Sequence, residues 1–247
     1  MYVDTTAPEI SMIVPAYNED ALIQDTLKGL RSYLSTRPET FEILVVDDGS
    51  RDNTVVLIEE WQKSNDVRLK LLLNKVNRGK GFSVRRGVQE SCGSYVIFID
   101  ADLPYELHAL DDFLAALRNG HDLAVGSRVL PDSEVRGVSA LRYFAGQVFS
   151  WLEQSVLATG LADTQCGFKA FTSSAAKEIF RRVTIDWFGF DVEMIYIARK
   201  LKYSIQPIAV QMIDRHRASR VRLVADSIKM FANLFTIRRL DQQGKYE

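Results

Sequence analysis

Short apolar runs alternate with stretches of helical spacing along the first half of the chain. The runs are rich in β-forming residues, which is typical of strands buried on both faces, and they cover residues 10–14, 41–46, 67–73 and 95–99. Apolar residues at helical spacing follow each run, at about residues 21–34, 53–63, 81–92 and 105–118. Asn18 or Asp20 is expected to cap the first helix. The alternation predicts an α/β fold with a Rossmann-like, mostly parallel sheet flanked by helices on both sides.

The second half of the chain has a less regular pattern. It predicts a short strand at 123–125, a mobile polar loop at 130–137, a long apolar helix at 140–157 and a strand-like end to the stretch 163–171. Ser173 or Ser174 is expected to cap a helix ending near Arg181, and the next helix opens within 187–193 and ends near Leu201. A last strand at 204–213 contains Pro207, which favours an edge position.

Polar loops follow the strand-like runs at residues 17–19, 47–50 and 100–102. Right-handed crossovers bring the carboxyl ends of parallel strands to one edge of a sheet, where ligands bind in open α/β folds. A single acid at a strand end is commonplace, but acids at all of these strand ends are not. The pattern therefore predicts a binding site at this edge.

Two acids end the run at 95–99. Asp100 and Asp102 are costly to bury unless a cation compensates for their charge. One interpretation is that they hold a hard divalent cation, which in turn holds a phosphorylated ligand. The alternative is an ordinary turn in which Asp102 caps the following helix. The pair alone does not decide between the two.

The composition is ordinary for a soluble globular enzyme, with 47% apolar and 26% charged residues in a chain of 247. The net charge of −1 creates no field that would favour nucleic acid. No apolar run approaches the roughly 18 residues that span a bilayer. Residues 1–9 lack the basic flank and apolar core of a signal peptide, so we expect Cys92 and Cys166 to be reduced thiols in the cytosol.

Residues 214–239 differ from the rest of the chain in charge. Seven Lys and Arg against two Asp give this stretch a net charge of +5, which leaves −6 for the remainder. The apolar residues of its second part fall on one helical face: Val224, Ile228, Phe231, Leu234 and Phe235. We favour a basic amphipathic helix in a membrane interface, and the alternative is that this stripe packs on the sheet. We therefore divide the chain into a main α/β domain, 1–213, and a basic extension, 214–247.

A glycine-containing loop, residues 77–81, precedes the third helix. Gly79 and Gly81 allow a ligand to approach the backbone closely, and Lys80 or Arg78 can meet a phosphate. The alternative is a tight turn before a helix. Val84 stands where the dinucleotide-binding fingerprint needs its third glycine, and the loop is not a Walker phosphate loop either, which argues against a dehydrogenase.

Five motifs in order carry a family resemblance: Val14-Pro15-Ala16-Tyr17-Asn18-Glu19, Val46-Asp47-Asp48-Gly49-Ser50 with Asp52 and Thr54, Asn77-Arg78-Gly79-Lys80-Gly81, Asp100-Ala101-Asp102, and Gly126-Ser127-Arg128. Together they resemble family 2 glycosyltransferases with the GT-A fold. Within that family the chain is similar to the polyprenyl-phosphate (dolichyl-phosphate) hexose synthases, over about residues 10–221. The stretch 163–169 looks most like the dolichyl-phosphate glucosyltransferase branch, whereas mannosyl members tend to differ there.

The resemblance implies roles for the matching positions. Asp100 and Asp102 would be the metal-binding DXD pair, for Mg²⁺ or Mn²⁺. The nucleotide-sugar site would comprise Pro15, Tyr17, Glu19, Asp47, Asp48, Gly79, Lys80, Asp100, Ala101 and Asp102. Catalytic residues would be Asp100, Asp102, Asp163, Asp191, Arg128 and Lys169, and the acceptor phosphate would meet Arg128, Lys169, Arg215 and Arg217. Pro104 stands where some relatives carry a metal-contacting Gln, which puts a third side-chain ligand in question.

The implied activity is the transfer of a hexose, with inversion, to a polyprenyl or dolichyl phosphate. UDP-glucose is the favoured donor, and GDP-mannose is the other candidate. A phosphate dianion needs cations around it more than a general base, so an indispensable base at Asp163 or Asp191 would indicate a hydroxyl acceptor. The alternatives are a family 2 transferase that adds sugar to a saccharide in cell-surface polysaccharide or glycan synthesis, and a non-catalytic nucleotide-binding or membrane-docking module.

The resemblance also bears on location. Many relatives carry a membrane-spanning segment, and this sequence shows none. If the acceptor is a lipid, the basic stretch 215–239 would bring the protein to the cytoplasmic face of a membrane as a peripheral protein. No nucleic-acid partner is expected, and the sequence leaves the oligomeric state open.

Overall fold

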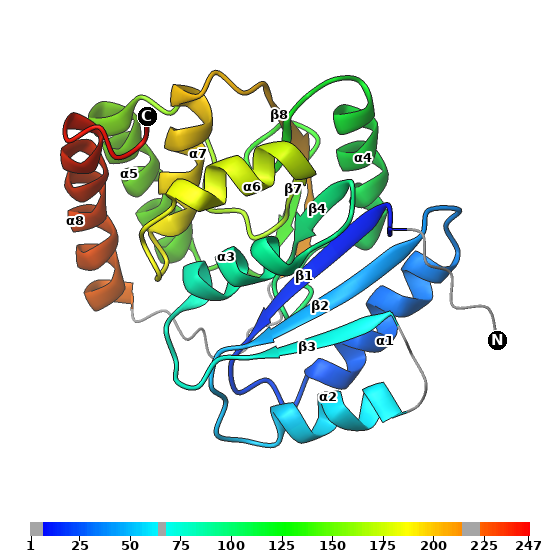
Figure 1. Cartoon of the computed structure of the whole chain (residues 1–247). Coiled ribbons are helices and arrows are strands. Elements are labelled where there is room, and N and C mark those ends of the chain that lie inside the picture. Colours follow the sequence, from blue (N-terminus) through cyan, green and yellow to red (C-terminus); the bar gives the residue numbers. More distant parts are fainter. Residues whose placement is uncertain (1–6, 64–67, 214–222) are drawn as a thin grey trace.

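The computed structural model describes residues 7–63, 68–213 and 223–247 (Figure 1). The strands in these ranges are β1 (Ile10–Ala16), β2 (Phe41–Asp47), β3 (Leu69–Leu73), β4 (Tyr95–Phe98), β5 (Leu123–Ser127), β6 (Glu134–Arg136), β7 (Lys169–Thr172), β8 (Ile205–Ala209) and β9 (Gln211–Ile213). The helices are α1 (Ile23–Ser35), α2 (Thr54–Lys63), α3 (Lys80–Glu90), α4 (Leu110–Arg118), α5 (Ala140–Leu157), α6 (Ser173–Arg182), α7 (Phe190–Lys200) and α8 (Leu223–Gln242). A 3₁₀ turn, Leu107–Ala109, precedes α4.

The described part of the chain contains a seven-stranded sheet in the order β3-β2-β1-β4-β7-β5-β8. β1 pairs in parallel with β2 and β4, β2 with β3, and β5 with β8, whereas β7 runs antiparallel to β4 and β5. The predicted mostly parallel sheet is therefore confirmed. After β3 the chain returns to the other side of β1, which makes the β1–β4 boundary a topological switch point. Ligands bind at such points in open α/β sheets.

Helices cover both faces of the sheet, which explains the nearly continuous apolar runs in its strands. On one face, α1, α2 and α4 pack against the strands through side chains such as Leu27, Ile58 and Phe113. On the other face, α3, α6 and α7 contribute Val84, Phe180 and other apolar side chains. In Figure 1, α3 and α6 lie on the upper side of the strands β1–β3, and α1 and α2 lie on their lower side.

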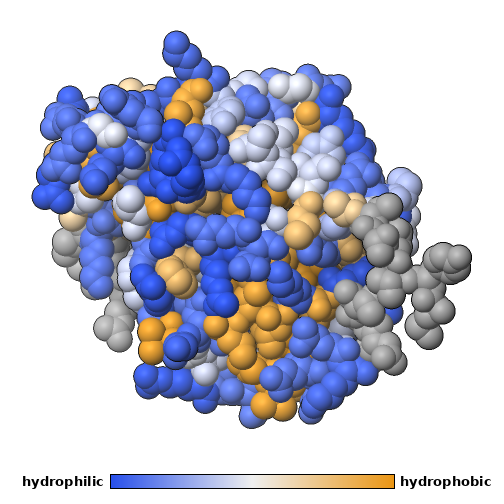
Figure 2. Space-filling view, viewed as in Figure 1, coloured by the Kyte–Doolittle hydropathy of each residue, from blue (hydrophilic) through white to orange (hydrophobic). Residues whose placement is uncertain are grey.

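The β3 end of the sheet is less well covered than its centre. Figure 2 shows hydrophobic residues gathered over this end of the molecule. Leu73 of β3 and Val56 of α2 are 48% and 51% exposed. An edge strand leaves part of its apolar surface uncovered, and exposed aliphatic side chains are normal for soluble proteins, so they do not by themselves mark a binding surface.

The last predicted strand is two strands in the structure. β8 is the edge strand of the large sheet and contains Pro207, as predicted, but β9 pairs with β6 in a separate two-stranded sheet. β6 lies within 130–137, so the predicted mobile loop contains a strand, and the amide of Glu134 donates to the carbonyl oxygen of Val210. A strand of three residues is too short to show a period of two in the sequence.

The predicted caps of two helices are wrong. No side chain caps α1, because Asn18 adopts a φ of 51° and its Oδ1 accepts a hydrogen bond from the Arg51 amide. The cap of α6 is Thr172, whose hydroxyl accepts from the Ala175 amide, in place of Ser173 or Ser174. The sequence shows which residue types can cap a helix, but the tertiary structure decides at which residue the helix begins.

The apolar stripe predicted on the C-terminal helix is divided between two sides of α8. Leu234 and Ile237 are buried in the core, whereas Phe231 and Phe235 are 38% and 52% exposed. α8 lies beside α5 (Figure 1). Of the predicted stripe, Leu234 therefore packs inside the protein and does not face a membrane. The side chains of Val224 and Ile228, and all of residues 214–222 with their basic cluster, lie outside the described residues. Within the described helices, no segment combines the length and apolar character needed to cross a membrane.

Candidate active site

The loops at the carboxyl ends of β1, β2 and β4 open into a cavity of 1890 Å³. Its remaining sides are formed by α5, by the loop before α7 and by the first half of α8. Most of the predicted site residues line this cavity: Pro15, Tyr17, Glu19, Asp48, Gly79, Lys80, Asp100, Ala101, Asp102, Arg128, Asp163 and Asp191. The predicted convergence of the strand-end loops is confirmed, and it occurs at the switch point of the sheet.

Among the described residues, two predicted site residues, Asp47 and Lys169, are not part of the cavity lining. Asp47 is buried, and its Oδ2 accepts hydrogen bonds from the amides of Gly49 and Ser50, so it shapes the turn after β2. Lys169 is completely buried. Arg215 and Arg217 lie outside the described residues. The structure thus gives Asp47 and Lys169 contacts within the protein in place of an exposed position in the cavity.

Asp48 holds the glycine-containing loop against the end of β2. Its Oδ1 accepts hydrogen bonds from Nδ2 of Asn74 at 2.8 Å and from the amide of Arg78 at 3.0 Å. Its Oδ2 accepts from the amide of Gly79 at 2.7 Å. Gly79 has a φ of 104°, and a Cβ atom there would lie 2.5 Å from the carbonyl oxygen of Asp186, so the position requires glycine. Asp48 therefore fixes the backbone that leads into α3.

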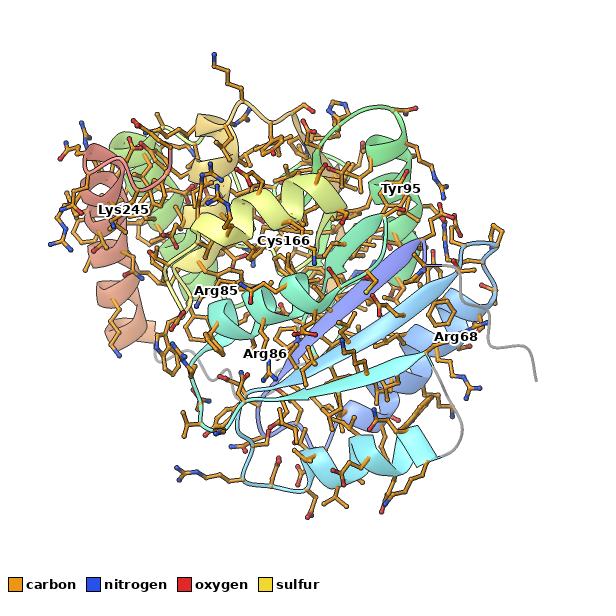
Figure 3. The ribbon with its side chains drawn as sticks, in the orientation of Figure 1. Arg68, Arg85, Arg86, Tyr95, Cys166 and Lys245 are labelled. Atoms are coloured by element: carbon orange, nitrogen blue, oxygen red, sulfur yellow. The ribbon has the colours of Figure 1, made fainter. Side chains whose placement is uncertain are left out.

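Two arginines tie α3 to the segments on either side of it (Figure 3). Arg85 donates to Oδ1 of Asp186 at 2.6 Å and to the carbonyl oxygen of Val183 at 3.1 Å. Arg86 donates to the carbonyl oxygen of Leu73 at 2.6 Å. The sequence analysis did not identify Asp186, which also pairs with Arg78 of the glycine-containing loop. These contacts fix α3 through its second turn, one turn away from Lys80.

Asp100 lies at the centre of the charged part of the cavity. Nζ of Lys80, the first residue of α3, lies 2.5 Å from its Oδ1. On its other side, a Cβ atom on Gly167 would lie 1.9 Å from Oδ2 of Asp100, so glycine is needed there to leave room for the carboxylate. Asp102 is exposed, and Glu106 is the residue that precedes the 3₁₀ turn. The alternative in which Asp102 caps the following helix is therefore wrong.

A second ion pair, between Lys169 and Asp191, lies deeper in the protein than the pair of Lys80 and Asp100. Nζ of Lys169 lies 2.6 Å from Oδ1 of Asp191 and donates to the carbonyl oxygen of Cys166. The ammonium groups of Lys169 and Lys80 lie 5.3 Å and 5.9 Å from the centre of the Phe98 ring, within the range of a cation–π contact. Two ammonium groups thus share one region with three carboxylates: Asp100, Asp102 and Asp191.

Arg128 and Asp163 form a two-pronged ion pair. Nε and Nη2 of Arg128 each lie 2.8 Å from a carboxylate oxygen of Asp163, and the Arg128 amide donates at 2.9 Å. Burial alone would raise the pKa of Asp163, but the hydrogen bonds and the charge of Arg128 outweigh it and lower that pKa. A carboxylate held ionised and paired in this way is poorly suited to be a general base. The Arg128 side chain is 32% exposed, so it reaches the cavity surface.

Glu153 is a functional candidate that the sequence analysis missed. It is 1% exposed, and its two carboxylate oxygens accept hydrogen bonds from the hydroxyls of Thr159 at 2.8 Å and Thr164 at 2.6 Å. Burial raises its pKa to about 6. Its contacts tie α5 to the loop that carries Asp163. The available signal was a lone acid among the apolar residues of 140–157.

The carboxylates of the cavity fit a divalent ion, but only as part of its coordination shell. Within the described residues, no group of three or more His, Cys, Asp and Glu side chains could hold a metal. The ammonium of Lys80 on Asp100 nevertheless marks a position that favours positive charge. Oδ1 of Asn77 and Nε2 of Gln165 are buried without a hydrogen-bond partner in the described structure, and both residues line the cavity. The residues therefore fit an ion that takes its remaining ligands from a bound anion and water.

The opposite part of the cavity is apolar. Tyr143 and Phe144 of α5 are 62% and 67% exposed. Phe231 of α8 borders the same cavity and stacks edge-on against Phe235, with ring centres 5.2 Å apart. One cavity thus combines a charged cluster suited to phosphate groups with an aromatic wall suited to hydrocarbon.

Comparisons with known sequences agree with this geometry. The profile of glycosyl transferase family 2 matches residues 11–180. The dolichyl-phosphate beta-glucosyltransferase of Dictyostelium discoideum is 34% identical over 241 residues, which cover 93% of this chain and 73% of that protein. The Homo sapiens protein of the same name is 34% identical over 225 residues, covering 85% of this chain and 69% of that protein.

Solved structures share the fold at lower sequence identity. Glucosyl-3-phosphoglycerate synthase from Mycobacterium tuberculosis, in complex with Mn²⁺, UDP and glucosyl-3-phosphoglycerate, superimposes with a TM-score of 0.68 at 18% identity, covering 93% of this chain and 80% of that chain. Mannosyl-3-phosphoglycerate synthase from Rubrobacter xylanophilus gives 0.68 at 18% identity, covering 96% and 75%. At this identity the likeness concerns the fold alone, which is of the GT-A type. On the evidence of its sequence relatives, the chain belongs to glycosyl transferase family 2.

Proposed function

We propose that this chain transfers glucose from UDP-glucose to the phosphate of a dolichyl or other polyprenyl carrier, with inversion at the anomeric carbon. The proposal rests on one observation: the charged cluster around Asp100 and the aromatic wall of α5 line the same cavity. A donor diphosphate is an anion and a polyprenyl chain is a hydrocarbon, so each part of the cavity has a chemically matching occupant. Relatives at 34% identity are named dolichyl-phosphate beta-glucosyltransferases, which supports the same choice.

The donor occupies the side of the cavity formed by β1, β2 and β4 in this proposal. Tyr17, Glu19 and Asp48 lie beside the nucleoside. Asp100 and Asp102 hold Mg²⁺ or Mn²⁺, which stabilises the charge of the leaving diphosphate when it is bound. A structural relative that was crystallised with Mn²⁺ and UDP-glucose supports a divalent ion and a uridine donor.

The acceptor phosphate lies at Arg128 in this proposal, with the predicted Arg215 and Arg217 as further cations. A phosphate monoester has a second pKa of about 6 and is largely a dianion at neutral pH, so it needs no base to attack the anomeric carbon. Asp163 holds Arg128 at the cavity surface. Lys169 acts through Asp191 and positions that carboxylate beside the reacting sugar.

A membrane surface lies against the aromatic side of the cavity in this proposal. Tyr143, Phe144 and Trp151 of α5 are all more than 60% exposed, and aromatic side chains of this kind favour the interface between lipid and water. The sequence of 214–222 adds positive charge that suits anionic lipids. The cytoplasmic side of that membrane, and the division between a catalytic domain of 1–213 and an extension of 214–247, stay predictions.

Transfer into lipid tests the proposal directly. Purified protein is incubated with radiolabelled UDP-glucose or GDP-mannose, polyprenyl phosphate and Mg²⁺ or Mn²⁺, with EDTA in a parallel reaction. Label from UDP-glucose that enters the organic phase and depends on the metal is the expected result. If neither donor labels the lipid while UDP still binds in a metal-dependent way, the lipid acceptor is wrong and a saccharide acceptor replaces it.

A further inference from the structure

Lys80 occupies an electrostatically unusual position. It is the first residue of α3, where the backbone N–H groups of a helix favour anions and disfavour cations. Its ammonium is stabilised there by Asp100, with Nζ 2.5 Å from Oδ1. A cation at this position is therefore favourable only because carboxylates lie close to it.

The two ammonium groups of the cluster differ in their freedom to move. Lys169 is completely buried between Asp191 and the carbonyl oxygen of Cys166. The side chain of Lys80 is 19% exposed and faces the cavity. Its ammonium also lies 5.8 Å from the centre of the Phe190 ring. Lys80 can thus turn toward a ligand in the cavity. Lys169 cannot leave Asp191 without leaving that carboxylate buried and unpaired.

We propose that the ammonium of Lys80 neutralises Asp100 as long as the cavity is empty. When a donor binds, this ammonium moves to the donor's diphosphate, and Asp100 becomes available to a divalent ion. The part of this inference that concerns the donor rests on the proposed function. The part that concerns Asp100 rests on the ion pair alone. Lys80 and a divalent ion compete for one carboxylate, since two cations within a few ångströms of each other repel strongly in a partly buried site.

This arrangement makes Lys80 act in opposite directions on two ligands. In the absence of a donor, its ammonium must be displaced from Asp100 before a metal ion binds, so it weakens metal binding. With a diphosphate present, the ammonium gains a new anionic partner and strengthens nucleotide binding. A residue with a merely structural role would weaken both interactions or neither.

The test measures Mn²⁺ binding by the loss of the free-ion signal in electron paramagnetic resonance, without any donor. Lys80→Met, which retains the apolar stem of the side chain, is expected to bind Mn²⁺ about tenfold more tightly than the unchanged protein. The affinity of the same variant for UDP in the presence of Mn²⁺ is expected to fall about tenfold. Lys70→Met is the matched control. Lys70 of β3 forms an exposed ion pair with Glu90 at the far end of α3, so its replacement should change neither value.

Unchanged or weaker Mn²⁺ binding by Lys80→Met would overturn the inference. Lys80→Gln, which carries a polar neutral side chain, is measured in parallel and must show the same gain, so that a folding defect in one variant does not decide the result. The Mn²⁺ measurement uses no donor and no lipid. A failure of the lipid transfer assay therefore leaves this result standing, and a failure here leaves the proposed transfer reaction standing.

Discussion

The two walls of the cavity are held in place by different kinds of interaction. On the donor side, buried carboxylates fix the loops: Asp47 accepts from two backbone amides, and Asp48 accepts from two more and from Asn74. On the acceptor side, α5 is anchored by its inward residues Glu153 and Leu157, while its aromatic residues face outward. The donor wall is a set of pre-shaped loops, and the acceptor wall is a helix with an uncovered apolar face.

This difference matches the ligands proposed for each wall. A diphosphate and a nucleoside have fixed polar groups, which need donors and acceptors held at fixed positions before binding. A hydrocarbon chain makes non-directional contacts, so its surface needs apolar area more than fixed geometry. We therefore expect substitutions on the donor wall to reduce the transfer rate, and substitutions on the acceptor wall to reduce attachment to lipid.

The largest effect is expected at the centre of the donor wall. Asp100→Asn removes the charge of a proposed metal ligand and the partner of Lys80, and should lower the transfer rate about 1,000-fold, equivalent to about 4 kcal/mol. Binding to lipid vesicles should not change. Asp112→Asn, an exposed position in α4, is the matched control. A transfer rate within a few-fold of the unchanged protein would show that Asp100 is not a ligand of a catalytic ion.

Steric displacement of the same carboxylate should have the next largest effect. Gly167→Ala would put a Cβ atom 1.9 Å from Oδ2 of Asp100, so the carboxylate must move. A shift of about 1 Å in such a group costs about 100-fold in the transfer rate. Gly29→Ala in α1 is the control, because its Cβ atom would meet Leu103 at an ordinary 3.5 Å. Thermal unfolding measured on both variants separates a displaced Asp100 from a damaged fold.

The acceptor wall can be tested by removing its aromatic groups. Replacement of Tyr143, Phe144 and Trp151 together by Ser removes exposed apolar area, and should weaken binding to vesicles of anionic phospholipid about 100-fold. UDP binding should stay the same. The control replaces Val56 and Leu73 by Ser, since these are exposed apolar residues elsewhere on the surface. Equal loss of vesicle binding in both proteins would contradict a membrane role for α5.

The anchor of the acceptor wall gives the smallest expected effect, and it depends on pH. The pKa of Glu153 is raised from 4.5 to about 6 in the folded protein. Between these values the folded state binds more protons than the unfolded state, so the free energy of unfolding falls as the pH rises, by about 2 kcal/mol. Glu153→Gln stays neutral, and should be more stable than the unchanged protein above pH 6 by about that amount.

The same variant should show no advantage below pH 4.5, where Glu153 is protonated in both states. Urea unfolding at pH 4.5 and pH 7 measures the difference. A variant that is less stable at pH 7 would mean that Thr159 and Thr164 need the charged carboxylate, and that the hydrogen bonds outweigh the cost of burying it.

Much of the donor wall could be predicted from the sequence, and little of the acceptor wall. The strand-end acids could be identified from the sequence, because an acid next to a buried apolar run is a local pattern. The outward aromatic face of α5 and the role of Glu153 did not, since an apolar helix gives no sign of which side the core will cover. β6, and the pairing of β9 with it in a separate sheet, were missed for a related reason, because each strand is short and its partner lies far along the chain.

The sequence by itself determined the order of most strands and helices, the mostly parallel character of the sheet they form and the edge at which its acids gather. These properties depend on periodicity and on neighbours a few residues apart, which a single chain displays directly. The tertiary structure alone decided the partners: Lys80 with Asp100, Arg128 with Asp163, and Lys169 with Asp191. Such pairs join segments that are distant in the sequence. Which charged groups pair is fixed only when packing has excluded water and brought particular side chains close together.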